Sequence, residues 1–162
     1  MSTTAADQTL LEWLAGDWSV ARDINDGQGS FHGRAAFTPQ PDGTLRWHET
    51  GDLTLDGATL PAYRTLTIDA AGQVRFDDGR PFHDLVLVEG ACDAFHPCGP
   101  DAYTGRYEVV GPDAFVVTWR VRGPGRDDTI FSRYTRAVSG APRPPNDDDD
   151  EAATPRPSPA RS

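Results

Sequence analysis

Residues 45–68, LRWHETGDLTLDGATLPAYRTLTI, decide the fold of this chain. Within each half of the stretch, apolar side chains recur at every second position, which is the repeat of a β-strand. The Asp56-Gly57 dipeptide between the halves favours a two-residue hairpin turn, because both residues tolerate positive φ. The stretch therefore predicts two antiparallel strands, residues 45–55 and 60–68, joined by a tight turn.

The same alternation extends from this hairpin toward both ends of the chain. The runs are separated by Gly, Pro and Asp turn signals, with no helical repeat between them. They cover residues 18–24, 31–37, 74–76, 82–89, 102–110, 114–122 and 129–137. Because parallel pairing needs long crossover connections, this order predicts one antiparallel, meandering sheet of about nine or ten strands.

A sheet of this many strands must close into a barrel or split into a sandwich. The hairpin connections favour closure. Three charged residues, Arg22, Glu49 and Arg64, also stand on otherwise apolar strand faces. A packed sandwich core has little room for them, whereas a barrel can enclose a cavity. We therefore predict an all-β, up-and-down barrel around a cavity.

The two ends of the chain differ from the predicted barrel. Thr9-Leu10-Leu11-Glu12 fits a helix capping box and predicts a helix of about two turns that ends at Gly16. Residues 139–162 are rich in Pro and Asp and hold no large apolar side chain. We therefore predict a disordered acidic tail after a barrel domain at residues 1–138. An arm that contacts a protein partner is the alternative for the tail.

Composition limits the classes of partner. The 162 residues carry 15 arginines, no lysine and 25 acidic side chains, a net charge of −10. This charge disfavours nucleic acid and anionic membrane surfaces. No apolar run is long enough to cross a bilayer, and the N-terminus lacks the pattern of a secretory signal. We expect a cytoplasmic monomer or homodimer whose partner is a small-molecule ligand.

Gly16-Asp17-Trp18, between a short helix and the first strand, resembles the Gly-x-Trp signature of the lipocalins and related calycins. The resemblance implies an up-and-down barrel in which Trp18 plugs the closed end. It also implies that an arginine of the last strand, Arg133 or Arg136, packs across the tryptophan ring. An arginine over an indole is a favourable cation–π pair.

Three further strings resemble an uncharacterised bacterial family of lipocalin-like domains. They are FDDGRPFHDL at residues 76–85, HPCGPDAY at 96–103 and TWRVRGPGRD at 118–127. The resemblance runs from residue 11 to residue 136, supports the fold, and brings no established activity with it. It leads us to expect a lysine and an aromatic residue near the hairpin at 126–128, where this chain has Arg126 and Asp128.

Residues 77–84 gather acids, an arginine and a histidine around a Gly and a Pro. One interpretation is a tight turn with a capping aspartate and an Asp–Arg ion pair. The other is a polar site at the barrel mouth, where His83 faces the interior within reach of Arg80 or Asp78. On an enzyme, His83 would be the general acid or base, oriented by Asp78 or Asp84.

Arginine and aromatic side chains predict the class of ligand. Arginine is seldom buried without a carboxylate or a ligand anion, and its planar fork matches carboxylate and phosphate groups. Aromatic side chains would supply flat apolar walls. We predict that an anionic, partly aromatic small molecule contacts Arg80, His83, His96, Asp101, Tyr103, Trp119, Arg126 and Tyr134.

Other chemistries remain as alternatives. His83, His96 and Cys98 are metal ligands in kind, but their spacing matches no standard zinc pattern, so we predict no metal. Cys98 beside a histidine has the residue types of a nucleophile pair. Nitrobindin-type proteins hold haem through a histidine on a late strand, and no histidine here lies in the last two predicted strands. We predict no cofactor. Three hypotheses remain: a ligand-binding barrel, an enzyme on it, and a protein-interaction domain.

Overall fold

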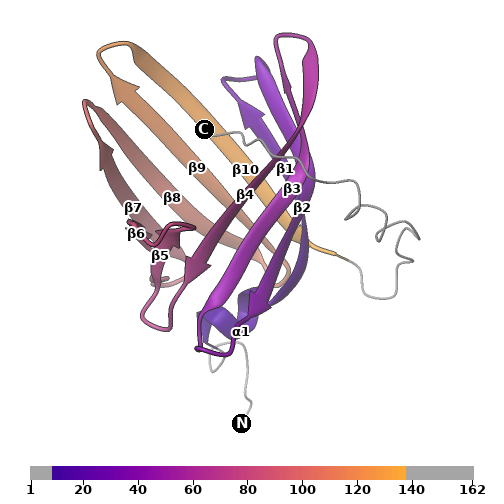
Figure 1. Cartoon of the computed structure of the whole chain (residues 1–162), viewed down its shortest axis with the longest axis vertical. Helices are drawn as coiled ribbons and strands as arrows, with labels where there is room; N and C mark the ends of the chain where they lie inside the picture. The colour runs from indigo at the N-terminus through magenta and orange to yellow at the C-terminus, as the bar shows by residue number, and fades with distance from the viewer. Residues whose placement is uncertain (1–8, 138–162) are drawn as a thin grey trace.

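The computed structural model describes residues 9–137, which form one short helix and ten antiparallel strands. The elements are α1 (Leu10–Leu14), β1 (Gly16–Ile24), β2 (Gly29–Pro39), β3 (Leu45–Leu55), β4 (Ala58–Ile68), β5 (Gln73–Phe76), β6 (Pro81–Asp84), β7 (Ala91–Cys98), β8 (Asp101–Gly111), β9 (Ala114–Gly123) and β10 (Arg126–Arg136). Their spatial order is β6-β5-β4-β3-β2-β1-β10-β9-β8-β7, so β1 and β10 join the two halves of the chain. The result is the predicted up-and-down barrel, nearly closed (Figure 1). The predicted tail lies outside the described residues.

The hairpin of β3 and β4 forms as its sequence predicts. Its register runs from Leu45 opposite Ile68 to Leu55 opposite Ala58. Asp56 and Gly57 at the turn have φ of 51° and 79°, the positive values that a tight hairpin turn needs. The alternation that marks the strands therefore sorts one face of each strand toward the barrel interior.

One strand prediction was wrong, and one strand was not predicted. The run at residues 82–89 leaves the sheet after Asp84 because its partner β5 begins at Gln73, opposite Asp84. The strand β7, whose last residues include a proline, has no counterpart among the predicted strands. Pro97 nevertheless pairs with Ala102, at the tip of the β7–β8 hairpin.

The closed end of the barrel is packed around Trp18, which has no exposed surface. Its Nε1 donates to the Leu14 carbonyl oxygen at 2.8 Å, and the Arg136 guanidinium lies 4.3 Å from its ring centroid. The plug and the arginine implied by the lipocalin resemblance are thus both present. The helix α1 is held by the predicted capping box of Thr9 and Glu12.

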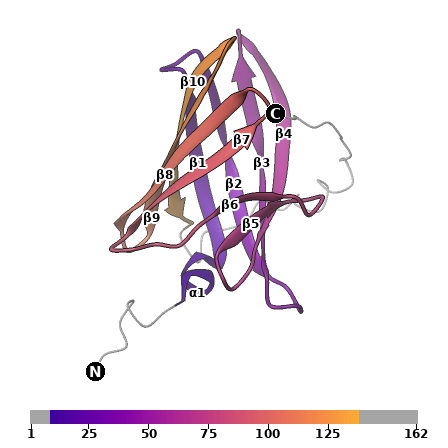
Figure 2. The ribbon, with the colours of Figure 1, turned by 90° about the vertical axis from the view of Figure 1, so that its left-hand side faces the viewer.

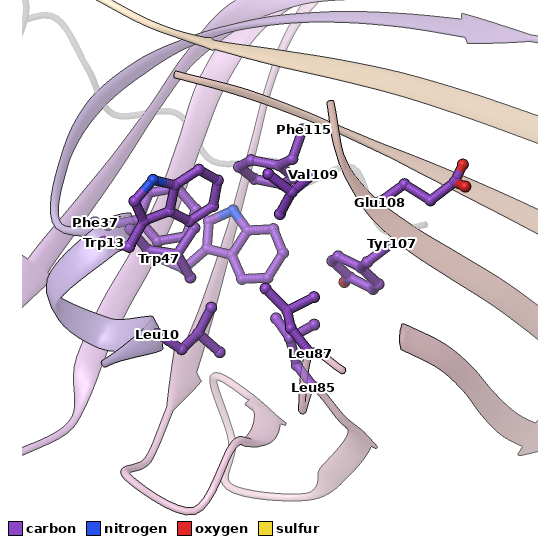
Figure 3. A pocket seen from close by; sticks show the side chains of 11 residues that line it. Leu10, Trp13, Phe37, Trp47, Leu85, Leu87, Tyr107, Glu108, Val109 and Phe115 are labelled. Atoms are coloured by element: carbon purple, nitrogen blue, oxygen red, sulfur yellow. The ribbon is translucent and has the colours of Figure 1, made fainter. Parts of the chain in front are cut away.

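Only a small space remains beneath α1. Figure 3 shows apolar and aromatic side chains, among them Leu10, Phe37 and Phe115, gathered around it. Its volume is about 10 Å³, room for at most one water molecule. This end of the barrel is therefore filled core. The single short helix of the described residues is also not long enough to cross a membrane.

The two end strands of the sheet, β6 and β7, face each other across a seam. β5 pairs with β4 only over residues 66–68, so within the described chain residues 58–65 of β4 have no strand on that side. Side chains bridge the seam at β6, where Phe82 stacks on Trp119 of β9 with ring centroids 5.3 Å apart. Figure 2 faces this side of the barrel, with the β5–β6 hairpin below β7. The barrel is thus less tightly closed along the seam than elsewhere.

Candidate functional site

The open half of the barrel encloses a cavity of about 500 Å³, within the range of small-molecule sites. Every second residue of β10 lines this cavity, from its mouth to its inner end. Arg126 and Asp128 lie at the mouth, where β10 begins, and Ile130 follows. Ser132 and Tyr134 come next and are buried at the inner end, which we call the floor.

Glu49 is the centre of the floor and is 1% exposed. Its Oε1 accepts hydrogen bonds from Nη2 of Arg22 at 3.0 Å and Nη2 of Arg64 at 3.3 Å. Its Oε2 accepts from Nε1 of Trp47 at 2.9 Å and from the Tyr134 hydroxyl. Both carboxylate oxygens are therefore satisfied, as a buried charge requires.

The floor is positively charged at neutral pH. Burial raises the pKa of the Glu49 carboxyl, but Arg64 and Arg22, together with the hydrogen bonds from Tyr134 and Trp47, outweigh burial and lower the pKa from 4.5 to about 2. Burial lowers the pKa of Arg22, but Glu49 outweighs this and raises it overall. Two guanidinium groups and one carboxylate therefore leave a net charge of +1 in the floor.

The two floor arginines are held differently. The Arg22 side chain is 14% exposed, donates from Nε to Ser132 Oγ at 2.7 Å and from Nη2 to Tyr134 at 3.0 Å. The Arg64 side chain is 42% exposed and lies over the Trp47 ring, 5.7 Å from its centroid. Within residues 9–137, Glu49 is its one hydrogen-bond partner. The Nε and Nη1 donors of Arg64 therefore remain available to a ligand.

The mouth carries an arginine that is already paired. Nε of Arg126 donates to Asp128 Oδ2 at 2.8 Å, and its Nη1 donates to the Tyr103 hydroxyl at 3.1 Å. A second carboxylate, Asp101, lies 3.9 Å from Nη1. Nδ2 of Asn25 donates to the other oxygen of Asp128 at 2.8 Å, which ties β10 to the end of β1. One arginine and two aspartates give the mouth a net charge of −1.

An aromatic wall closes one side of the cavity. A Cβ on Gly105 would lie 2.7 Å from ring atoms of Trp119, so glycine lets this ring lie directly against β8. Phe82 stacks on Trp119, and Tyr103 meets it edge-on with centroids 6.3 Å apart. His96 lies behind the wall, half-buried, with its ring 5.1 Å from that of Phe82.

The structure gathers part of the predicted site. Tyr103, Trp119, Arg126 and Tyr134 line the cavity. Asp101 and His96 lie beside lining residues, against Arg126 and Tyr103 respectively. Arg80 and His83 are not among the lining residues. The lining also includes Arg22, Glu49 and Arg64, which the sequence marked as charged positions on apolar faces without assigning them to the ligand.

The predicted contact between His83 and Arg80 or Asp78 was wrong. Asp78 caps its own exposed turn: its carboxylate accepts the Arg80 backbone N–H at 3.0 Å and Arg80 Nε at 2.8 Å. His83 does face the interior, as predicted, and is 6% exposed. Its Nδ1 donates to the Asp84 carbonyl oxygen at 3.0 Å, so Nε2 accepts from the Tyr107 hydroxyl at 3.1 Å. His83 thus links β6 to β8 across the seam.

Burial lowers the pKa of His83 from 6.5 to about 4, although the Asp84 carbonyl favours the charged ring. Arg64 and His96 add to the lowering. Because the folded pKa lies below the unfolded value, the neutral ring stabilises the fold fully above about pH 6.5 and the contribution is lost as pH falls toward 4. Protonated His83 would also lose the hydrogen bond that it accepts from Tyr107.

We therefore expect His83→Gln to flatten the pH dependence of stability. Between neutral pH and about pH 4, the free energy of unfolding of the wild-type protein should fall by up to about 3 kcal/mol more than that of the variant. Urea unfolding across this range measures the difference. His32→Gln, at an exposed position of β2, is the control and should retain the wild-type slope. Equal slopes for wild type and His83→Gln would contradict the assignment.

The two cysteines lie on β7. Cys92 is half-buried, Cys98 is exposed, and both thiols are free. Across residues 9–137, no three His, Cys, Asp or Glu side chains gather in a way that could hold a metal ion.

Several solved structures are similar to this chain. The S-type phycobiliprotein lyase CPES from Guillardia theta has a TM-score of 0.54 at 10% identity, covering 85% of this chain and 95% of that one. A DUF3598 protein of unknown function from Nostoc punctiforme has a TM-score of 0.49 at 15% identity, covering 78% and 49%. The redesigned β-barrel mFAP1, bound to DFHBI, has a TM-score of 0.45 at 19% identity, covering 78% and 97%. At such identities, the likeness to the lyase shows the fold alone.

No curated protein matches this chain. A family model, described as a family of unknown function (DUF6314), matches residues 14–136. These bounds run from the last residue of α1 to the last residue of β10, so the match covers the whole barrel. The resemblance to an uncharacterised lipocalin-like family is thereby confirmed. The chain belongs to the DUF6314 family.

Proposed function

We propose that the barrel binds a small anionic molecule in its cavity, with Arg64 as the anchor. The observation that carries this proposal is the unequal pairing of the floor, where two arginines share the one carboxylate of Glu49. Arg22 is the more buried partner and has further bonds to Ser132 and Tyr134. Arg64 is left with free donors beside an open cavity, which favours a carboxylate or phosphate there.

The expected strength of this contact is substantial. A hydrogen bond to a charged group contributes about 1.5–3 kcal/mol, equivalent to roughly tenfold to a hundredfold in affinity. The Trp47 ring beneath the Arg64 guanidinium favours a fixed orientation for its planar fork. The aromatic wall of Trp119, Phe82 and Tyr103 supplies apolar surface for the rest of the ligand.

Of the two residues named to orient His83 on an enzyme, Asp84 holds it through a backbone carbonyl oxygen, whereas Asp78 pairs with Arg80. Both ring nitrogens of His83 are bonded to groups of the fold, and Asp78 lies in an exposed turn with Arg80. Binding without turnover is therefore the function that the geometry supports best. We also propose a cytoplasmic location and a monomeric or homodimeric state for the binding protein.

Titration with the fluorescent anion anilinonaphthalene sulfonate tests the proposal. We expect saturable binding with one site per chain, and Arg64→Gln should weaken it at least about tenfold. Arg22, Trp47 and Tyr134 still satisfy Glu49 in this variant, so the fold should persist by circular dichroism. Arg34→Gln, on an exposed position of β2, is the matched control. Equal affinities for wild type, Arg64→Gln and Arg34→Gln would overturn the proposal.

A further inference from the structure

The cavity is sorted by polarity along its depth, and we infer from this that its ligand is an amphipathic carboxylate bound head first. The inference rests on the proposed anion site at Arg64 and adds the ligand's chemical class and direction. The acid group would lie at the floor. The apolar body would lie in a collar, by which we mean the side chains of Ile24, Leu53, Leu55 and Ile130.

Two strands show the order of the layers. Inward residues of β10 pass from Asp128 at the mouth to Ile130 in the collar and Ser132 at the floor. On β3, Leu55 and Leu53 precede Glu49 in the same direction. On β10 the collar therefore stands between a polar mouth and a polar floor, and on β3 it stands on the mouth side of the floor. A ligand that enters by the mouth passes along the collar on its way to Arg64.

Small residues lie between collar and floor on β2, β3 and β4. Gly33 of β2 stands opposite Gly51 of β3, and Gly51 stands opposite Ala62 of β4. A Cβ on Gly33 would collide with the Thr50 carbonyl oxygen, so the two backbones approach more closely here than any other residue allows. This row carries no long side chain into the cavity, immediately above Glu49.

Charge sets the direction of binding. The floor carries a net +1, and the free donors of Arg64 point to an anion there. At the mouth, Arg126 is shared between Asp128 and Asp101, so an acid group placed there would meet a net −1. An amphipathic anion is therefore favoured with its head at the floor and its tail toward the mouth.

Calorimetric titration with butyrate, octanoate, decanoate and decanol, each kept below its solubility limit and below any micelle concentration, tests the class of ligand. Each methylene buried in the collar should tighten binding by up to about fourfold, so decanoate should bind at least about tenfold more tightly than butyrate. Decanol, which lacks the charge, should bind at least about tenfold more weakly than decanoate. Decanoate binding no tighter than butyrate, or decanol equal to decanoate, would overturn the inference.

A collar variant separates the inference from the proposed function. Leu53→Asn should weaken decanoate about tenfold and butyrate less than about twofold. Leu60→Asn on β4 is the control, because Leu60 stands opposite Leu53 but is 61% exposed and outside the lining. If butyrate and anilinonaphthalene sulfonate bind through Arg64 but Leu53→Asn leaves the affinity for decanoate unchanged, the collar is refuted and the anion site is not. Failure of every anion to bind would refute the anion site itself.

A decanoate analogue with a nitroxide at its tail tests the direction. Head-first binding places the nitroxide near the mouth, so amide resonances of the β3–β4 turn and of Arg126 should broaden in NMR spectra. The indole N–H of Trp47, at the floor, should broaden much less. The reverse pattern would mean that the tail lies at the floor and would overturn the head-first inference.

Discussion

Replacing Glu49 with glutamine should lower the free energy of unfolding by about 3–5 kcal/mol, because it leaves buried Arg22 without its counter-ion. The amide would also face Arg64, so two like charges would share a neutral partner. Urea unfolding at neutral pH measures the loss. Arg64 is the more exposed of the two arginines and can turn toward solvent, so most of the loss should come from Arg22.

The pH dependence of this loss provides a second check. The pKa of Glu49 lies at about 2, below its ordinary value of 4.5, so the carboxylate stabilises the fold fully above about pH 4.5 and the contribution is lost as pH falls toward 2. The difference in the free energy of unfolding between wild type and Glu49→Gln should therefore become smaller as pH falls from about 4.5 toward 2. Asp52→Asn, an exposed carboxylate on the same strand, should change stability by less than about 0.5 kcal/mol. A similarly small effect for Glu49→Gln would contradict the proposed pairing of the floor.

Trp18→Ala should lower the free energy of unfolding by about 3–5 kcal/mol, which is the range for removing a large aromatic side chain from a packed core. The ring is fully buried among Phe37, Phe115 and Trp13, with centroid distances of 6.4, 5.0 and 5.3 Å. Its loss would also remove the nearer of the two indole rings on which Arg136 lies, the other being that of Trp13. Thermal and urea unfolding measure the effect.

Phe95→Ala on β7 is the control for this prediction, because Phe95 is 59% exposed. It should cost less than about 1 kcal/mol. A double-mutant cycle with Arg136→Ala should give a coupling of about 1 kcal/mol for the cation–π pair. A loss below about 1 kcal/mol for Trp18→Ala would mean that the closed end does not depend on this plug.

The fold could be predicted because its signals are local. The turn at Asp56-Gly57 needs only two residues, and the alternation around it assigns each side chain to a face. The same alternation predicts that Glu49 lies inside the barrel. Both faces of the run at residues 82–89 carry apolar residues, so the inward position of His83 is predicted from Leu85 and Leu87, which share its face. The strand β7 escaped prediction because Pro97 is typical of a chain break, although it is tolerated at the hairpin tip where β7 ends.

The site could be predicted only in part because it depends on closure. Arg64 stands opposite Glu49 in the register of the β3–β4 hairpin, but Arg22 lies on β1 and reaches Glu49 across the intervening strand β2 only because the sheet curves. The sequence spacing of the two arginines does not reveal which of them keeps free hydrogen-bond donors, because that depends on distances in the folded barrel. His83 finds Tyr107 across the seam, between strands that are not paired with each other. The inward position of His83 could therefore be predicted from the sequence, whereas its hydrogen-bond partner Tyr107 could not.

Side-chain NMR of the arginines and tryptophans locates the anion site most directly. On addition of anilinonaphthalene sulfonate, the Nε–H resonance of Arg64 and the indole N–H of Trp47 should shift together and saturate at one equivalent. The Nε–H of exposed Arg34 should not move. Unchanged Arg64 and Trp47 resonances, with shifts confined to exposed side chains such as Arg34, would contradict an anion site in the barrel.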